Sequence, residues 1–147
     1  DYRLQKIEKK YTNDPDDPVI LEEYCDFLKE YLSQGFMEKQ MEQIYRNQYT
    51  QLLLKQLEQK VNLHTCVCLM ENLMVQRDFF LAEKILKIMD QNWHRGEEYW
   101  IWKIRYLAER KMGKELKQSL QALKEEHIYL SSRGKEALGF WLDGSKK

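Results

Sequence analysis

The chain has 147 residues, 43% of them hydrophobic and 33% charged, which is enough for one domain with a proper core and excludes a disordered chain. Its 24 basic side chains balance its 24 acidic ones, so it lacks the basic excess with which dedicated nucleic-acid or membrane-surface binders engage phosphates. No apolar run approaches the length that crosses a bilayer, and we expect no direct contact with nucleic acid or membrane.

The start of the chain and its cysteines bear on its origin. The sequence opens at Asp1, without Met and without a signal-peptide pattern, which predicts a fragment of a larger protein. Its three cysteines are an odd number, and without a secretory signal they favour free thiols in a reducing compartment. We therefore expect a cytoplasmic location.

Helix-forming residues dominate the whole sequence. Glu, Lys, Leu, Gln, Met and Arg lose little side-chain freedom in a helix, and both prolines lie within residues 13–18. No stretch alternates apolar and polar residues for long enough to require a strand, which predicts an all-α fold. Apolar periodicity and turn residues place eight helices, over residues 2–11, 18–32, 37–60, 64–75, 79–90, 97–111, 114–126 and 131–142.

Particular residues mark where these helices start. Pro18 stands in the first turn of the second helix, where its missing N–H is not needed. Asp78 is placed to cap the fifth helix, and Ser131 or Ser132 the eighth, while Asn62 breaks or caps the long third helix. Short turns join the second helix to the third, the fourth to the fifth and the sixth to the seventh, which indicates antiparallel hairpins.

The second half of the chain repeats on itself with a spacing of 34 residues. Met70 recurs as Ile104 and again as Leu138. This period is typical of tetratricopeptide-type hairpins, each of which buries its apolar face by stacking on its neighbours, so Trp100 and Ile104 are expected in the core. The other pairs in register are Cys66 and Trp100, Leu73 and Leu107, Ala82 and Leu116, Leu86 and Leu120, and Met89 and Leu123.

The segment 77–86, RDFFLAEKIL, resembles the second helix of a tetratricopeptide repeat. Trp100 matches the consensus Trp and Leu69 the consensus Leu, whereas Leu116 stands where the consensus has Ala. The resemblance implies a tetratricopeptide-like α-solenoid of about eight antiparallel helices in one domain over 1–147. Its hairpins would cover about 19–60, 63–91 and 97–126, between an N-terminal capping helix and a C-terminal one over 131–142.

A narrower resemblance covers about residues 45–141. There a long helix precedes two hairpins, a turn and a short capping helix, which is similar to the bacterial transcriptional activator domain, a helical module of bacterial regulators. The winged-helix DNA reader that usually accompanies that module is absent from this sequence. The resemblance implies a regulatory or dimerisation domain, for which a homodimer is one arrangement.

Two segments carry residues of the types that bind metal ions. His64 and Cys68 are four residues apart on one predicted helix and could face the same ion, whereas Cys66 points about the opposite way from Cys68. A four-ligand zinc site would need two more residues, so packing is the favoured interpretation. The aspartates of residues 14–17 lack the Gly and the distal Glu of an EF-hand and indicate a capping loop. We expect no metal and no cofactor.

Catalytic motifs are missing from the sequence. It has no glycine-rich phosphate loop, no His-Glu-x-x-His and no Gly-x-Ser-x-Gly, and its three histidines lie far apart along the chain. We expect no catalytic residues and no enzymatic activity. The leading hypothesis is a non-enzymatic module that binds a protein or peptide partner.

The first helices of the hairpins are expected to line the inner, partner-binding surface, with Trp102 and Tyr106 at its margin. Apolar contact and charge steering by Arg105 would provide the binding. Two alternatives remain open: the aromatic cluster of residues 93–106 belongs to the core, and the six basic residues between 103 and 117 form a solvated face. The predicted partner-binding residues are Val67, Glu71, Met74, Ile101, Trp102, Arg105, Tyr106 and Ala108.

Overall fold

The computed structural model describes residues 1–144 and folds them into eight α-helices, with no strand among the residues described. The all-α prediction is confirmed, and each helix begins within two residues of its predicted start. The third helix is one continuous helix of 21 residues. The helices are α1 Tyr2–Asn13, α2 Pro18–Ser33, α3 Lys39–Gln59, α4 Leu63–Gln76, α5 Phe79–Trp93, α6 Glu97–Glu109, α7 Gly113–Glu125 and α8 Ser132–Gly144.

Polar side chains cap the starts of several helices. Each accepts a hydrogen bond from a backbone N–H of the first turn, which has no partner inside the helix. Of the two serines considered for α8, Ser131 makes this contact, and Asn62 caps α4 instead of only ending α3. The capping residues are Asp1 for α1, Asp17 for α2, Asn62 for α4, Asp78 for α5 and Ser131 for α8.

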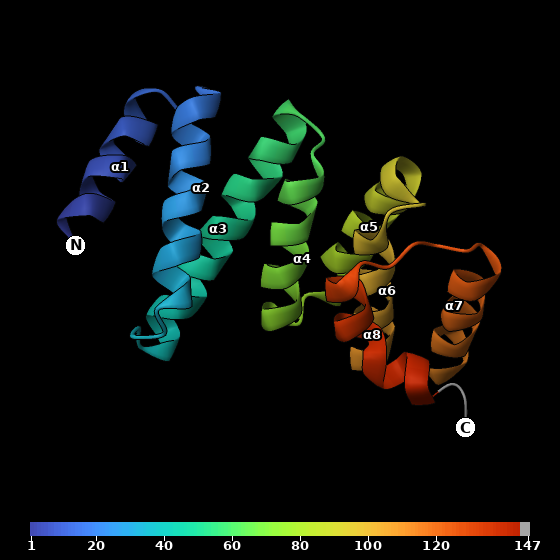
Figure 1. The fold of residues 1–147 in the computed structure, drawn as a ribbon. Coiled ribbons are helices and arrows are strands. Elements are labelled where there is room, and N and C mark those ends of the chain that lie inside the picture. Colours follow the sequence, from blue (N-terminus) through green and yellow to red (C-terminus); the bar gives the residue numbers. More distant parts are fainter. Residues whose placement is uncertain (145–147) are drawn as a thin grey trace. The chain divides into compact units, whose positions relative to one another are not determined.

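The helices fall into two compact units, residues 1–76 and 77–147. In the first unit α1, α2, α3 and α4 lie in a row, each packed against the next and running in the opposite direction (Figure 1). Leu21, Leu28, Leu53 and Leu69 are each at most 2% exposed and form the middle of its core. The predicted packing of the second helix against the third is confirmed, and the boundary between the units falls inside the predicted hairpin 63–91.

In the second unit, described here through residue 144, α6 is the central helix. It packs against α5, α7 and α8, which confirms the predicted pairing of the sixth helix with the seventh. Trp100 and Ile104 are 1% and 0% exposed, as the 34-residue repeat predicts for stacked positions. The Glu97 carboxylate at the start of α6 accepts a hydrogen bond from the backbone N–H of Ser131 at 2.8 Å and thereby holds the start of α8.

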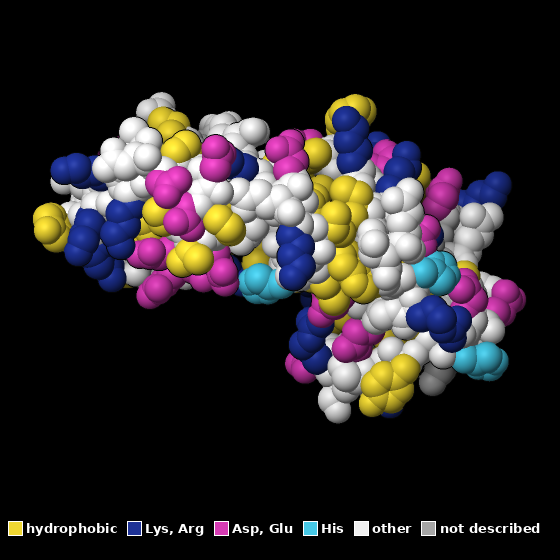
Figure 2. Space-filling view, turned by 90° about the horizontal axis from the view of Figure 1, so that it is seen from above, with side chains coloured by type: hydrophobic (Ala, Val, Ile, Leu, Met, Phe, Trp, Pro, Cys, Tyr) yellow, Lys and Arg dark blue, Asp and Glu magenta, His cyan; other side chains and the backbone are white. Residues whose placement is uncertain are grey.

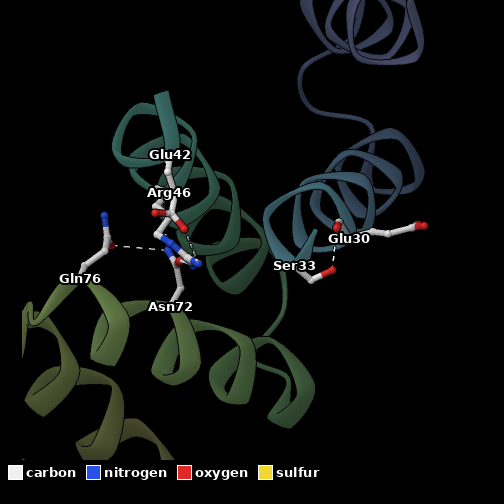
Figure 3. Close-up of polar contacts among 6 residues, drawn as sticks. All are labelled: Glu30, Ser33, Glu42, Arg46, Asn72 and Gln76. Atoms are coloured by element: carbon white, nitrogen blue, oxygen red, sulfur yellow. Dashed lines mark hydrogen bonds and ion pairs between the residues drawn. The ribbon is translucent and has the colours of Figure 1, made fainter. Parts of the chain in front are cut away.

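A buried amide joins α3 to α4 (Figure 3). Asn72 of α4 is 2% exposed and donates to the backbone carbonyl of Arg46 at 3.0 Å and to the Thr50 hydroxyl at 2.8 Å. Its amide oxygen accepts from the Arg46 guanidinium at 2.8 Å, and Arg46 also pairs with Glu42 at 3.2 Å. Because buried polar groups are costly without partners, these contacts fix how α4 lies on α3.

A histidine ties the ends of α5 and α7 within the second unit. The imidazole of His94 bonds to the carboxylate of Asp90 on α5, and its Nε2 lies 2.6 Å from Oε1 of Glu126, the residue after α7. These hydrogen bonds, to Asp90 and then to Glu126, raise the pKa of His94 above its ordinary value. The indole N–H of Trp100 donates to the His94 carbonyl at 2.7 Å and anchors the same loop to the core.

Within the described residues no helix has both the length and the apolar character that a membrane span requires.

Candidate functional site

A cleft of about 700 Å³ opens in the first unit among α2, α3 and α4. Figure 2 looks onto the end of this unit that carries the α1–α2 and α3–α4 connections, and shows acidic, basic and apolar side chains interspersed there in the left part of the view. The cleft residues come from the start of α2, the second half of α3 and the start of α4. They are Asp16, Pro18, Glu22, Cys25, Asp26, Tyr49, Leu53, Gln56, Gln59, Lys60, Asn62, His64, Thr65 and Cys68.

The floor of this α2/α4 cleft consists of Cys25, Tyr49, Leu53, Thr65 and Cys68, none more than 4% exposed. Burial raises the pKa of the Cys25 thiol to about 12, and burial together with the neighbouring Cys68 raises the pKa of Tyr49. Both groups therefore stay protonated at neutral pH. The Thr65 hydroxyl has no hydrogen-bond partner among the described residues, although the backbone N–H of Thr65 is bonded to the Asn62 side chain.

The walls of the cleft carry opposite charges. Glu22 and Asp26, one turn apart on α2, supply carboxylates that have no ion-pair partner in the described part of the chain. Asp16, before α2, pairs with Lys55 of α3 at 3.3 Å, so its charge is compensated. Lys60 lies on the side of the α3–α4 connection and is likewise unpaired within residues 1–144. The cleft is thus acidic along α2 and basic at its other side.

A smaller hollow of about 200 Å³ adjoins the cleft and shares Tyr49 and Cys68 with it. It also lies between α2 and α4, where the Lys29 ammonium donates to the Cys68 thiol at 3.6 Å. Glu71 and Asn72 of α4 line it as well. The two hollows together form a trough along the α2–α4 side of α3.

His64 and Cys68 do face one another, as their spacing predicts, with Nε2 and Sγ 3.6 Å apart. Among the described residues no group of three or more His, Cys, Asp or Glu side chains is arranged to hold a metal ion. Two donors fall short of the four that a structural zinc site uses. The pair therefore serves as part of the cleft lining.

Three of the predicted partner-binding residues lie on α4 in the first unit. Val67 and Met74 are half-buried, and Glu71 is exposed and lines the smaller hollow. Of the predicted partner-binding residues, Glu71 is therefore the one that lines the trough. Sequence reasoning missed the α2 and α3 residues of the cleft, because their juxtaposition depends on how three helices pack rather than on a local motif.

The other five lie on α6 in the second unit. Ile101, Trp102 and Tyr106 are 1%, 7% and 5% exposed, so these side chains belong to the core instead of facing solvent. The physical reason is that α6 is covered by helices α5, α7 and α8, which leaves it little free surface. Only Arg105 and Ala108 stay half-exposed.

The basic residues of the second unit are partly stacked on these aromatic rings. The Arg105 guanidinium lies 5.1 Å from the centre of the Trp102 ring, and Arg110 lies 5.6 Å from that of Tyr106 while donating to its hydroxyl at 2.9 Å. Lys103 sits 5.4 Å from the ring of Tyr99. Cation–π contacts of this kind hold the cationic ends over the rings and leave their charge in place.

No protein-family model, curated protein or solved structure matches this chain.

Proposed function

We propose that this chain is a non-enzymatic helical module that binds a protein or peptide segment, and that the α2/α4 cleft is its binding surface. The observation that carries the proposal is the cleft itself. Its volume of about 700 Å³ lies within the range of roughly 300–1,000 Å³ typical of ligand pockets. Its buried floor and polar rim are the combination expected of a surface that excludes water around a bound segment.

The chemistry of the floor favours binding over catalysis. A cysteine nucleophile acts as its thiolate, and burial holds the pKa of Cys25 near 12, far above neutral pH. A general base needs a pKa near the operating pH, whereas the pKa of the Tyr49 phenol is raised above its ordinary value. These groups offer apolar contact and hydrogen bonds to a ligand.

The test uses a library of random seven-residue peptides displayed on phage and selected on the full chain. We expect selected peptides to lose binding to Gln56→Trp, because Gln56 lines the cleft and an indole there fills part of it. Glu58→Trp is the matched control, since Glu58 is exposed on the same helix and is not a cleft residue. Equal binding to both variants, or no selection by the wild type, would contradict the proposal.

A second candidate function is dimerisation within a regulatory protein, in line with the resemblance to the bacterial transcriptional activator domain. It is favoured by apolar side chains left on the first half of α3, where Met41 and Ile44 are 43% and 57% exposed, and by Phe36 just before it at 92%. Large exposed apolar groups mark interaction surfaces. Sedimentation analysis should then show a dimer that Ile44→Lys converts to a monomer, and a monomeric wild type would dismiss this candidate.

A further inference from the structure

The smaller hollow between α2 and α4 is lined by a side chain with a buried N–H group that has no partner. Arg46 of α3 lines this hollow, and its two terminal nitrogens bond to Asn72 at 2.8 Å and to Glu42 at 3.2 Å (Figure 3). The third nitrogen of the guanidinium, Nε, is buried and has no hydrogen-bond partner in the part of the chain that the structure describes. Because a desolvated donor without an acceptor is costly, this N–H indicates an acceptor that comes from another molecule.

A second cation lines the same hollow. The ammonium of Lys29 on α2 donates to the Cys68 thiol at 3.6 Å and has no ion-pair partner among residues 1–144. A thiol is a weak acceptor, so most of the hydrogen-bonding capacity of this ammonium is unused. The hollow therefore presents two positively charged donor groups, one from α2 and one from α3, and suits an anionic acceptor.

The size and the apolar surface of the hollow limit what this anion can be. Its volume of about 200 Å³ is below the roughly 300–1,000 Å³ typical of ligand pockets and leaves room for one side chain. Leu32 and Tyr49, which are 5% and 4% exposed, line it and suit the methylene groups of such a side chain. Tyr49 and Cys68 also line the α2/α4 cleft, so a segment bound in the cleft can extend one side chain into the hollow.

We propose that the bound segment places one aspartate or glutamate side chain in the smaller hollow, an inference that rests on the proposed function. Its carboxylate accepts hydrogen bonds from the Arg46 Nε–H and from the Lys29 ammonium, and both bonds are charge-assisted. The buried N–H gains an acceptor in this way, and the charge of Lys29 gains a counterion. The rest of the segment lies in the α2/α4 cleft.

Carboxylates around the hollow restrict the segment to one acidic residue. Glu71 of α4 lines the hollow, is exposed and has no ion-pair partner in the described part of the chain. Glu22 and Asp26 of α2 line the adjoining cleft and are likewise unpaired within residues 1–144. These groups would repel a second negative charge on the segment, so a single acidic residue at a fixed position is favoured over a polyacidic segment.

The experiment measures how the phage-selected peptides bind three variants of the full chain. Lys29→Met removes the ammonium from the hollow, and Glu71→Gln removes the carboxylate from it. Lys9→Met is the matched control for Lys29→Met, since Lys9 is exposed on α1 and lines neither the cleft nor the smaller hollow. Circular dichroism verifies that each variant remains folded. The probes are the selected peptides, synthesised with a fluorophore and an amidated C-terminus, and copies in which Asn or Gln replaces the acidic residue.

We expect the selected peptides to share one Asp or Glu at a fixed position. Lys29→Met should bind them about fivefold more weakly than the wild type, as for a partly exposed ion pair, and Glu71→Gln should bind them more tightly. Lys9→Met should bind them as the wild type does, and the neutral copies should bind the wild type and Lys29→Met alike. In nitrogen–proton NMR spectra the Arg46 Nε–H signal should shift when the acidic peptide is added and stay in place with its neutral copy.

Selected peptides that lose binding to Gln56→Trp but share no acidic residue would overturn this inference and leave the proposed function standing. Equal weakening by Lys29→Met and Lys9→Met would also overturn it, as would an Arg46 Nε–H signal that the acidic peptide does not move. Loss of binding on amidation of the C-terminus would assign the hollow to a terminal carboxylate instead of a side chain.

Discussion

His94 holds two carboxylates from different parts of the second unit at one imidazole ring. Its hydrogen bonds to Asp90 and Glu126 raise its pKa when the chain is folded. Stability gained from the charged ring is therefore complete below the pKa of the unfolded imidazole, about 6.5, and is lost as the pH rises through the higher folded value. The contacts of His94 with Asp90 and Glu126 therefore stabilise the fold more in mild acid than at higher pH.

We predict that His94→Gln lowers the free energy of unfolding at pH 5.5, and that its difference from the wild type narrows toward pH 8.5. The pH-dependent part should stay below about 1 kcal/mol, because the side chain is 40% exposed and solvent screens the pairs. Urea unfolding at several pH values measures it. A difference that widens as the pH rises would contradict the assignment.

The control for this prediction is His127→Asn. The imidazole of His127 has no hydrogen-bond or ion-pair partner among the described residues, and its backbone has a φ of 53°, which asparagine adopts more readily than most side chains. In this variant the pH dependence of stability that His94 causes should remain as in the wild type.

At the scale of helices, Asn72 determines how firmly α4 is held on α3. We predict that Asn72→Ala lowers the free energy of unfolding by about 2–3 kcal/mol, because the Thr50 hydroxyl and the Arg46 guanidinium lose a partner in a buried position. Urea denaturation followed by circular dichroism measures the change. Asn92→Ala is the control, since Asn92 is exposed and bonds only within α5, and its cost should stay within about 0.5 kcal/mol. Similar costs for the two substitutions would contradict this role of Asn72.

The helices could be predicted from the sequence because their ends are encoded locally. Pro18 fixes the first turn of α2, and Asp78 caps α5, which begins at the next residue. The apolar residues between such signals recur with the helical period. The core positions Trp100 and Ile104 followed in the same way from the repeat. In each case the information lies within one or two helices.

The cleft could not be predicted, because it depends on contacts far apart in the sequence. Glu22 on α2 and Thr65 on α4 line one hollow only because α3 packs between them in a particular register. The available local signals were the four-residue spacing of His64 and Cys68 on α4 and that of Glu22 and Asp26 on α2, which places each pair on one face of its helix. For α6 the sequence predicted too much exposed surface. Trp102 was expected at an exposed margin, but it is buried because α6 packs against three other helices.

At the scale of the whole molecule, the division into two units places the entire cleft in the first. Every residue that lines it falls between Asp16 and Cys68, and the buried side chains of α1 and α2 belong to the same unit. The sequence repeat, in contrast, runs from residue 66 onward and lies mostly in the second unit. The part of the chain with the clearest repeat is therefore not the part that contains the α2/α4 cleft.

We predict that a fragment of residues 1–76 folds by itself and binds the selected peptides with the affinity of the full chain. Its helices α1 to α4 enclose their own apolar core, and domains of this size do fold alone. Circular dichroism and urea titration should show a helical chain that unfolds cooperatively, and fluorescence anisotropy measures the binding. A folded fragment that does not bind would mean that residues 77–147 contribute to recognition, and a fragment that stays unfolded would mean that the cleft depends on them for its structure.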